Sequence, residues 1–284
     1  MLTEEVMKMK FWKLHGIGND FIAIDGRFDG IEPENYSSFA AKVCNRRMSV
    51  GADGLLVVKN SDKADVEMVY YNSDGSRAAM CGNGIRCFCR FVYDTHIVKK
   101  EEFTVDTLDG VKHITLKTSD GRVNSIKVDM GHGSFLAKDV PVNTDEEMFI
   151  NQKVKILDRE FELSSMLMGV PHTIVFIDEF DIDFIEKYGP AIEHCEIFPE
   201  KTNVNFVKVR DQYNINVYTW ERGCGYTLGC GTGMTASAVI CNYLEKTEKS
   251  VNVTSKGGTV KIDIDDCIYM TGPAVKICEG YLEV

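Results

Sequence analysis

The feature that most constrains the fold of this chain is an internal repeat that relates its two halves. The segment "VYYNSDGSRAAMCGNGIRCFCRFV" superposes on "YTWERGCGYTLGCGTGMTASAVIC" when Cys81 is placed on Cys230, a shift of 149 residues. A second pair, "HGIGNDFIAID" and "GVPHTIVFID", matches at a shift of 153 residues and places His172 opposite Asn19. Strand–turn–helix units recur by chance in α/β proteins. Two matches at nearly equal shifts nevertheless predict two similar domains.

Both halves of the repeat predict the same local structure. Short segments rich in Val, Ile, Thr and aromatic residues, such as "VEMVYYN" and "INVYTWE", predict strands. The helix expected after Cys81 gathers on one face Ile85, Phe88, Cys89 and Val92. The helix expected after Cys230 is apolar nearly all round, so a sheet should enclose it. We therefore expect an α+β fold of two pseudo-symmetric domains, each a curved, mostly antiparallel sheet wrapped around a central helix.

Composition narrows the class of protein. The 284 residues carry a net charge of -11, which argues against a nucleic-acid surface, because binding phosphates requires clustered Lys and Arg. No apolar run approaches the roughly 20 residues that span a bilayer, and the first ten residues do not resemble a secretion signal. We expect a cytoplasmic protein with no membrane partner, whose ten cysteines are mostly thiols. The sequence leaves the oligomeric state open, a homodimer included.

Each cysteine of the repeat stands directly before a glycine-rich helix start, in "CGNG" and "CGTG". The first N–H groups of a helix and its positive dipole end stabilise a thiolate and can also bind a carboxylate. If both thiols flank one α-carbon, one can remove the α-proton while the other protonates the opposite face. The repeated motif therefore predicts stereoinversion of a carboxylate-bearing substrate.

Other cofactor chemistry finds no support in the motifs. The remaining cysteines lack zinc-type spacing, and Cys87 and Cys89 point to different faces of one helix, so we expect no metal. Neither the dinucleotide nor the nucleotide glycine motif occurs, and we expect no cofactor. A pyridoxal lysine has no reliable local signature, but the paired thiols make it unnecessary.

The motifs "HGIGNDF", "NSDGS", "MCGNG", "TNVNF" and "ERGCGYTLGCGTG" together resemble those of the diaminopimelate epimerase family. These are cofactor-independent isomerases of lysine and peptidoglycan-precursor biosynthesis, and the resemblance runs from about residue 10 to the C-terminus. It implies that LL- and meso-2,6-diaminopimelate are interconverted in a cleft between two lobes. The N-terminal lobe would comprise residues 9–126 plus 276–284 and carry Cys81. The C-terminal lobe would comprise residues 127–275 and carry Cys230.

The resemblance also implies roles for individual residues. Cys81 and Cys230 would be the acid and base, with His172 and Glu221 nearby to set their protonation. Four residues at the two helix starts would hold the reacting α-carboxylate: Gly82, Asn83, Gly231 and Thr232. The rest of the substrate site would be lined by Asn19, Asn72, Asn203, Glu221 and Arg222, with the arginine paired to the distal carboxylate. The repeat independently favours Asn72 and Glu221, because each lies nine residues before its cysteine.

Three departures from the family pattern bear on the substrate. Val170 stands in "GVPH" where the family often has Asn, Gly54 stands where some members have Gln, and Tyr226 interrupts a usual "GET". One lost amide removes a hydrogen bond of roughly 0.5–1.5 kcal/mol. A racemase of another amino acid such as histidine is therefore the alternative function. A non-catalytic binder of a small dicarboxylate is the alternative outside enzymes, although it gives no reason for two thiols.

Overall fold

The computed structural model describes residues 8–28 and 31–283, which form two compact units. Unit 1 comprises Met1–Val128 and Gly272–Val284, and unit 2 comprises Asp129–Thr271. The lobe boundaries inferred from the resemblance stay a prediction, and residues 29, 30 and 284 of the predicted N-terminal lobe lie outside the described residues. Among the described residues, no helix is both long and apolar enough to cross a bilayer.

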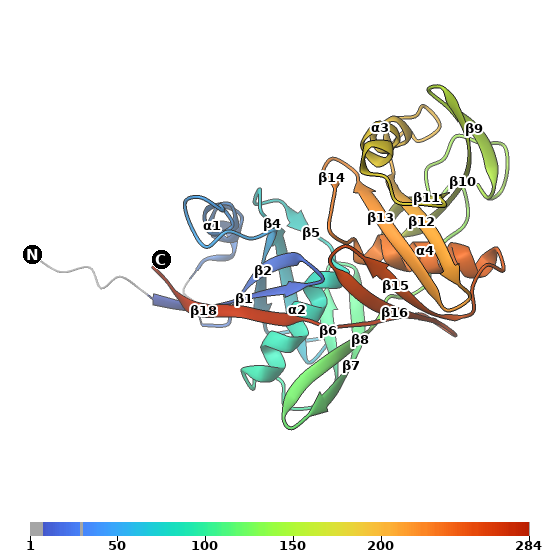
Figure 1. Ribbon diagram of the computed structural model, residues 1–284. Coiled ribbons are helices and arrows are strands. Elements are labelled where there is room, and N and C mark those ends of the chain that lie inside the picture. Colours follow the sequence, from blue (N-terminus) through green and yellow to red (C-terminus); the bar gives the residue numbers. More distant parts are fainter. Residues whose placement is uncertain (1–7, 29–30, 284) are drawn as a thin grey trace, which may run out of the picture. The chain divides into compact units, whose positions relative to one another are not determined.

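Unit 1 is built on a mixed sheet (Figure 1). Its strands follow one another across the sheet in the order β18 (Val275–Glu283), β1 (Lys8–Gly16), β2 (Asn19–Asp25), β3 (Gly54–Lys59), β4 (Val66–Asn72), β6 (Glu102–Thr107), β7 (Gly110–Ser119) and β8 (Arg122–Asp129). Among the pairings described within the unit, only β2–β3 and β4–β6 are parallel. The short strand β5 (Arg77–Ala78) also pairs with β4.

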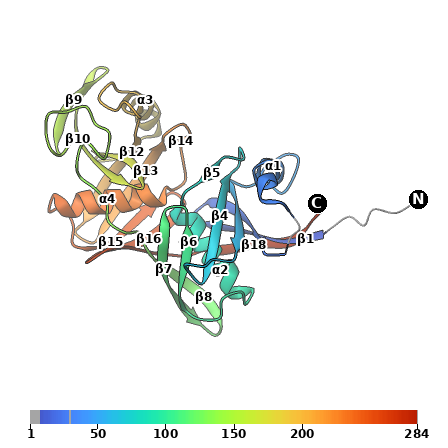
Figure 2. The same ribbon diagram turned by 180° about the vertical axis from the view of Figure 1, so that it is seen from behind.

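Two α-helices pack against this sheet. The central helix α2 (Gly82–Asp94) packs against β1, β2 and β3. The four residues predicted to share its apolar face are all fully buried, as expected: Ile85, Phe88, Cys89 and Val92. A short helix η1 (Pro33–Asn35) leads into α1 (Tyr36–Val43), which packs against β3 and β4 (Figure 2). Alternate residues of β3, Leu55 and Val57, join the α1 core cluster.

Unit 2 repeats this topology strand for strand. Its order is β9 (Gln152–Ile156), β10 (Arg159–Met168), β11 (Val170–Phe176), β12 (Asn203–Asp211), β13 (Asn214–Glu221), β15 (Ser250–Ser255), β16 (Gly258–Ile264) and β17 (Ile268–Gly272). The short β14 (Gly225–Tyr226) pairs with β13 as β5 does with β4. The parallel pairs β11–β12 and β13–β15 also match those of unit 1.

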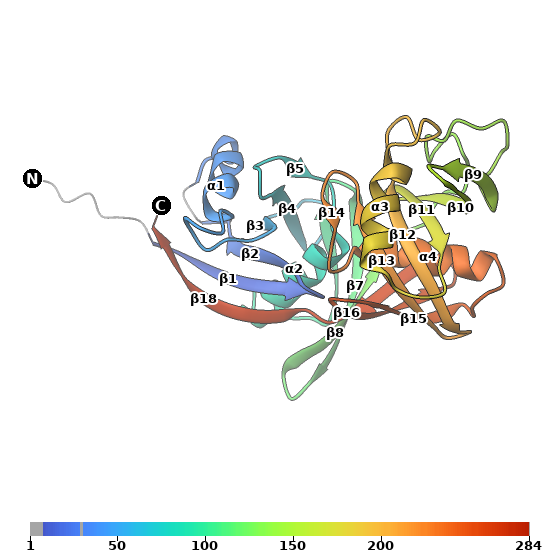
Figure 3. The same ribbon diagram turned by 45° about the horizontal axis from the view of Figure 1, so that its top comes forward.

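Helices α3 (Ile182–Glu193) and α4 (Gly231–Tyr243) cover opposite faces of β11–β13 (Figure 3). On one face, Val204 and Phe206 of β12 pack with Ile185 of α3. On the other face lies α4, whose residues from Gly233 to Cys241 are all buried, so the predicted enclosure is confirmed. The α+β fold class with two like halves is confirmed as well.

Strand register tests the predicted repeat directly. In unit 1 Leu55 pairs with Tyr71, and in unit 2 Val204 pairs with Trp220, so both strands obey the shift of 149 residues. The match of Asn72 with Glu221, the next residue in each strand, is thereby confirmed.

The match of Asn19 with His172 is wrong by two residues. Phe21 pairs with Gly54, whereas His172 pairs with Asn203, so His172 stands at the place of Phe21. A shorter hairpin turn in unit 2 accounts for one of these two residues. Two residues, 17 and 18, separate β1 from β2, but only Gly169, with a φ of +71°, separates β10 from β11.

Candidate active site

In unit 1, Cys81 is the N-cap of α2. Its extended backbone (φ −140°, ψ 125°) turns the chain into the helix, and its sulfur accepts a hydrogen bond from the Gly84 N–H at 3.4 Å. This is the geometry in which Ser, Thr, Asp or Asn normally caps a helix. The half-buried thiol therefore occupies the position where the helix dipole acts most strongly.

Two asparagines, both predicted to belong to the site, lie beside this thiol. Asn19, at the start of β2, has its Oδ1 3.5 Å from Cys81 Sγ, and Asn83 Nδ2 donates to the same oxygen at 3.3 Å. The Asn19 Nδ2 donates to Asp53 Oδ2 at 2.6 Å. The structure therefore brings Asn19, Cys81 and Asn83 into one cluster, fastened by Asp53.

Asn72 ends β4 opposite Gly54, and its side chain is oriented by Tyr70. The Tyr70 hydroxyl donates to Asn72 Oδ1 at 2.8 Å, and Asn72 Nδ2 donates to Ser76 Oγ at 3.0 Å. A Cβ on Gly54 would lie 2.6 Å from Tyr70 Cε2, so the tyrosine ring occupies the space that a glutamine at residue 54 would need. The Tyr70 ring can occupy this position because residue 54 is glycine.

In unit 2, Cys230 caps α4 in the same way as Cys81 caps α2. Its backbone is extended (φ −102°, ψ 114°), and its sulfur accepts from the Gly233 N–H at 3.4 Å. The thiol is buried, with 8% of its surface exposed, and its sulfur lies 3.4 Å from the hydroxyl oxygen of Thr232. Gly82 and Gly231 are the first residues of the two helices, as predicted.

His172 is fully buried in β11, next to a polar pair that fixes its tautomer. Asn205 Nδ2 lies 3.2 Å from His172 Nδ1 and 3.4 Å from the Thr173 carbonyl, and Thr219 Oγ1 donates to Asn205 Oδ1 at 3.0 Å. Because a carbonyl only accepts, Asn205 must present its NH₂ group on this side. His172 Nδ1 is then an acceptor, and the ring proton resides on Nε2.

Burial keeps this imidazole neutral. Burial above all, and then the nearby charge of Arg222, lowers the pKa of His172 from 6.5 to about 3. The Nε2 atom is buried and has no hydrogen-bond partner among the described residues. His172 thus offers one buried, neutral N–H donor, the kind of group that can stabilise a thiolate or a carboxylate.

The start of β12 lies beside the end of β13. Asn203 begins β12, Glu221 ends β13, and Arg222 follows it. Asn203 Oδ1 accepts from the Arg222 N–H at 2.9 Å, and its Nδ2 donates to the Pro171 carbonyl at 2.9 Å. Glu221 Oε1 accepts from the Thr227 hydroxyl at 2.5 Å. Arg222 Nη1 donates to the Glu200 carbonyl at 2.8 Å, which fixes one side of the guanidinium.

The structure thus brings Asn19, Cys81 and Asn83 together in unit 1 and Asn203 and Arg222 together in unit 2. The sequence reasoning missed the side chains that orient the predicted residues. These are Asp53, Tyr70, Arg86, Asn205 and Thr219. Arg86 could have been suspected from the sequence, because a charged residue interrupts the apolar pattern of α2. The structure shows that this residue is fully buried. Asp53 and Asn205 gave no such signal, since polar residues at strand ends and in turns are common.

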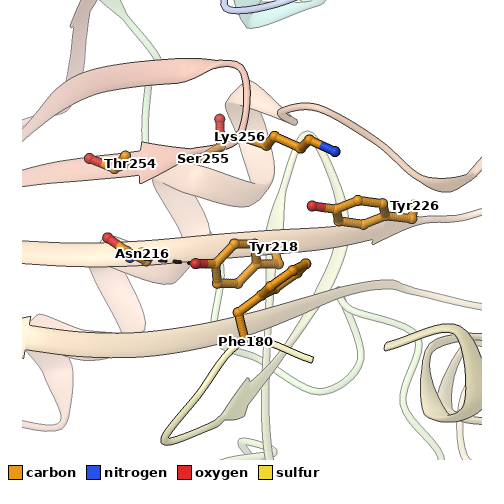
Figure 4. Close-up of a pocket in the computed structure, with 7 residues that line it drawn as sticks. All are labelled: Phe180, Asn216, Tyr218, Tyr226, Thr254, Ser255 and Lys256. Atoms are coloured by element: carbon orange, nitrogen blue, oxygen red, sulfur yellow. Dashed lines mark hydrogen bonds between the residues drawn. The ribbon is translucent and has the colours of Figure 1, made fainter. Parts of the chain in front are cut away.

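Two surface pockets occupy equivalent places in the two units, and neither is lined by a predicted site residue. The pocket of unit 2, about 280 Å³, is walled by aromatic rings (Figure 4): it is lined by Phe180, Asn216, Tyr218, Tyr226, Thr254, Ser255 and Lys256. The pocket of unit 1, about 390 Å³, is lined by Tyr36, Lys59, Asn60, Glu67, Val69, Tyr71 and Arg77. Tyr226 therefore belongs to an aromatic wall in unit 2. No group of three His, Cys, Asp or Glu side chains in the described part of the chain is arranged to hold a metal ion.

Comparison with solved structures shows the same fold at low sequence identity. A hydroxyproline epimerase from Agrobacterium vitis superposes with a TM-score of 0.73 at 13% identity, covering 99% of this chain and 94% of its own. A phenazine biosynthesis protein of the PhzF family from Bacillus anthracis superposes with a TM-score of 0.70 at 17% identity, covering 98% and 99%.

Sequence comparison is more specific. The family described as diaminopimelate epimerase matches residues 11–136 and 164–277. A diaminopimelate epimerase from Clostridium perfringens is 49% identical over 276 residues, 96% of this chain and 98% of its own length. One from Alkaliphilus metalliredigens is 47% identical over 279 residues, 96% and 97% of the two chains. With two cysteine-capped helices in equivalent halves and relatives of this identity over nearly its whole length, the chain belongs to the diaminopimelate epimerase family.

Proposed function

We propose that this chain is a cytoplasmic, cofactor-independent isomerase that interconverts LL- and meso-2,6-diaminopimelate by two-base proton transfer at the α-carbon. The observation that carries the proposal is the equivalence of Cys81 and Cys230. Each sulfur caps the central helix of its unit and accepts from the N–H three residues later. Equivalent sulfurs in two like halves suit a reaction that must treat both faces of one carbon.

In this mechanism the thiolate of one cysteine removes the α-proton, and the thiol of the other delivers a proton to the opposite face. The carbanion is stabilised by its carboxylate, whose growing charge is met by helix N–H groups. Residues at the two helix starts would bind that carboxylate: Gly82, Asn83, Gly231 and Thr232. The mechanism requires the two sulfurs to lie on opposite sides of one bound substrate.

The remaining site residues would hold the rest of the substrate. The Arg222 guanidinium suits the distal carboxylate, because it forms bidentate, charge-assisted hydrogen bonds. Asn19, Asn72, Asn203 and Glu221 would bind the amino groups and the carboxylates. His172, neutral and donating through Nε2, would stabilise an anionic neighbour.

Replacement of each cysteine by alanine tests the proposal. Either Cys81→Ala or Cys230→Ala should abolish the conversion of LL- to meso-diaminopimelate, followed by chiral chromatography. In D₂O the wild-type protein should introduce deuterium at the α-carbon. Full activity in either variant contradicts the two-base mechanism. Inversion of histidine or another amino acid, with none of diaminopimelate, favours the alternative racemase, and tight binding without inversion favours the dicarboxylate binder.

A further inference from the structure

A chain of hydrogen bonds passes Cys81 and connects one charged side chain to another. Arg86 Nη2 donates to Asn83 Oδ1 at 2.9 Å. Asn83 Nδ2 donates to Asn19 Oδ1 at 3.3 Å, and Asn19 Nδ2 donates to Asp53 Oδ2 at 2.6 Å. Each side chain therefore donates to the next, from the guanidinium to the carboxylate.

The charged side chains at the two ends, Arg86 and Asp53, fix the donor-to-acceptor direction of every hydrogen bond between them. A guanidinium can only donate and a carboxylate can only accept, so each amide between them has one favourable orientation. Burial, with no exposed surface, lowers the pKa of Arg86, but arginine stays protonated in proteins. Asp53 is itself held, because Arg46 Nη2 donates to its Oδ1 at 2.7 Å and the Asp20 N–H donates to its Oδ2 at 3.1 Å.

This direction decides which atom of Asn19 faces the thiol. The amide oxygen, an acceptor, lies 3.5 Å from Cys81 Sγ. A thiol can donate its proton to that oxygen, whereas a thiolate would meet another electron-rich atom. We propose that the Arg86–Asn83–Asn19–Asp53 chain holds Cys81 as the protonated thiol in the substrate-free protein, with Arg86 and Asp53 as positioning residues.

The ionisable groups around this thiol come from several elements. Arg86 and Cys87 lie on α2 itself, and each interacts electrostatically with Cys81. Asp20 of β2 and Asp53 before β3 bring negative charge. Arg46 pairs with both carboxylates and Lys13 with Asp20, which offsets that charge. The positive charge of Arg86 by itself favours the Cys81 thiolate, and the hydrogen bond from Cys81 Sγ to Asn19 Oδ1 opposes it by favouring the thiol.

Cys230 has different neighbours. Its sulfur accepts from the Gly233 N–H and lies 3.4 Å from the Thr232 hydroxyl, which can turn its proton toward a thiolate. The two halves thus assign the resting proton to Cys81 and the resting negative charge to Cys230.

In terms of the proposed function, on which this step rests, Cys230 is the base of the first turnover for the stereoisomer whose α-hydrogen faces it; the other stereoisomer requires the Cys81 thiolate. Its sulfur takes the α-proton as the C–H bond breaks, and the Cys81 S–H bond breaks as a new C–H bond forms on the opposite face. The turnover leaves the proton on Cys230 and the thiolate on Cys81.

Alkylation of the substrate-free protein tests the resting state without measuring activity. The full chain is treated with iodoacetamide from pH 6 to pH 10, digested with trypsin and analysed by mass spectrometry. Cleavage after Arg77 and Arg86 releases Cys81 in "AAMCGNGIR" with no other cysteine, and fragment masses resolve Cys230 within residues 223–246. The pH midpoint of the rate, rather than the rate itself, removes the effect of differing accessibility.

The Cys81 midpoint should lie about 1 pH unit above that of Cys230. Equal midpoints, or the reverse order, would overturn the proposal. This result stands apart from the proposed function, since a protein with no epimerase activity still reports the order of the two midpoints.

A matched pair of variants tests the role of the Arg86–Asn83–Asn19–Asp53 hydrogen bonds. In Asp53→Asn, residue 53 can donate, so Asn19 is free to turn its NH₂ group toward Cys81, and the Cys81 midpoint should fall while that of Cys230 stays unchanged. Asp25→Asn is the control, because Asp25 pairs with Arg27 at 2.8 Å in the same unit, outside this chain of hydrogen bonds. An unchanged Cys81 midpoint in folded Asp53→Asn, checked by circular dichroism, rejects the role of the chain. If that variant does not fold, the wild-type midpoints decide.

Discussion

Gly233 provides the space that the Asn205 side chain occupies. A Cβ on Gly233 would overlap Asn205 Oδ1, the atom that accepts from Thr219. At the equivalent Gly84 a Cβ would lie 3.4 Å from Cys81 Cβ and from the Phe21 ring, which is an ordinary contact. The two glycines of the repeated motif therefore serve different purposes.

Alanine substitutions at Gly233 and Gly84 should therefore have different effects. Gly233→Ala should lower the free energy of unfolding by about 1–3 kcal/mol and lower kcat, because it displaces Asn205 from His172. Gly84→Ala should change the free energy of unfolding by less than about 1 kcal/mol. Urea unfolding and steady-state kinetics measure both effects. Equal effects of the two substitutions would contradict the proposed packing.

The buried His172 should make stability depend on pH. The folded protein protonates this ring only near pH 3, whereas the unfolded chain does so near 6.5. The unfolded state therefore binds more protons between these values, and the free energy of unfolding should fall as the pH falls below about 6.5, by up to about 1.4 kcal/mol per pH unit.

Two variants isolate this contribution in urea unfolding from pH 7.5 to pH 5. His172→Gln should flatten the pH dependence. His194→Gln should not, because the His194 side chain is 54% exposed. A slope that is the same in His172→Gln and in the wild-type protein would show that the buried ring does not cause it.

Arg222 should bind the distal carboxylate of the substrate and so contribute to substrate affinity. Arg222→Met should raise KM for diaminopimelate by about 10- to 150-fold, the loss of charge-assisted hydrogen bonds worth about 1.5–3 kcal/mol. Arg222→Lys should recover part of this affinity. An unchanged KM in Arg222→Met would place the distal carboxylate elsewhere.

Tyr70 should act through Asn72. Tyr70→Phe removes the hydroxyl that donates to Asn72 Oδ1, and KM should rise by about 2- to 13-fold with little change in stability. Tyr71→Phe is the control, since Tyr71 points to the other face and packs against Tyr36. Equal KM values for Tyr70→Phe and the wild-type protein would remove Tyr70 from the site.

If Cys81 and Cys230 act on one α-carbon, as proposed, a short reagent should be able to join their two sulfurs. Treatment of the substrate-free protein with dibromobimane, a short reagent that joins two thiols, should link the tryptic peptide 78–86 to the peptide 223–246. The variant Cys224→Ser should still give this product, because Cys224 lies in the second peptide but is not one of the proposed pair. Failure to form the link in Cys224→Ser would count against a shared substrate between the sulfurs.

Much of this fold was predictable from the sequence because each copy of the repeat is a short pattern of neighbouring residues. Strand–turn–helix order, the helix starts at Cys81 and Cys230 and the enclosure of α4 all follow from patterns within about 25 residues. The register of Asn72 with Glu221 follows for the same reason. The register of His172 did not, because a change in turn length moves a strand without changing its pattern.

By itself the sequence determined that two like halves each present a thiol at a helix start, since helix capping and hydrophobic periodicity are properties of neighbouring residues. Only the tertiary structure decided which way the Asn19 and Asn205 amides point, and hence the proton positions on Cys81 and His172. Those orientations depend on Asp53, Arg86, Thr219 and the Thr173 carbonyl, groups that the fold brings together from separate strands and helices. Hydrogen-bond direction is set by contact in space, and no local pattern of residues encodes it.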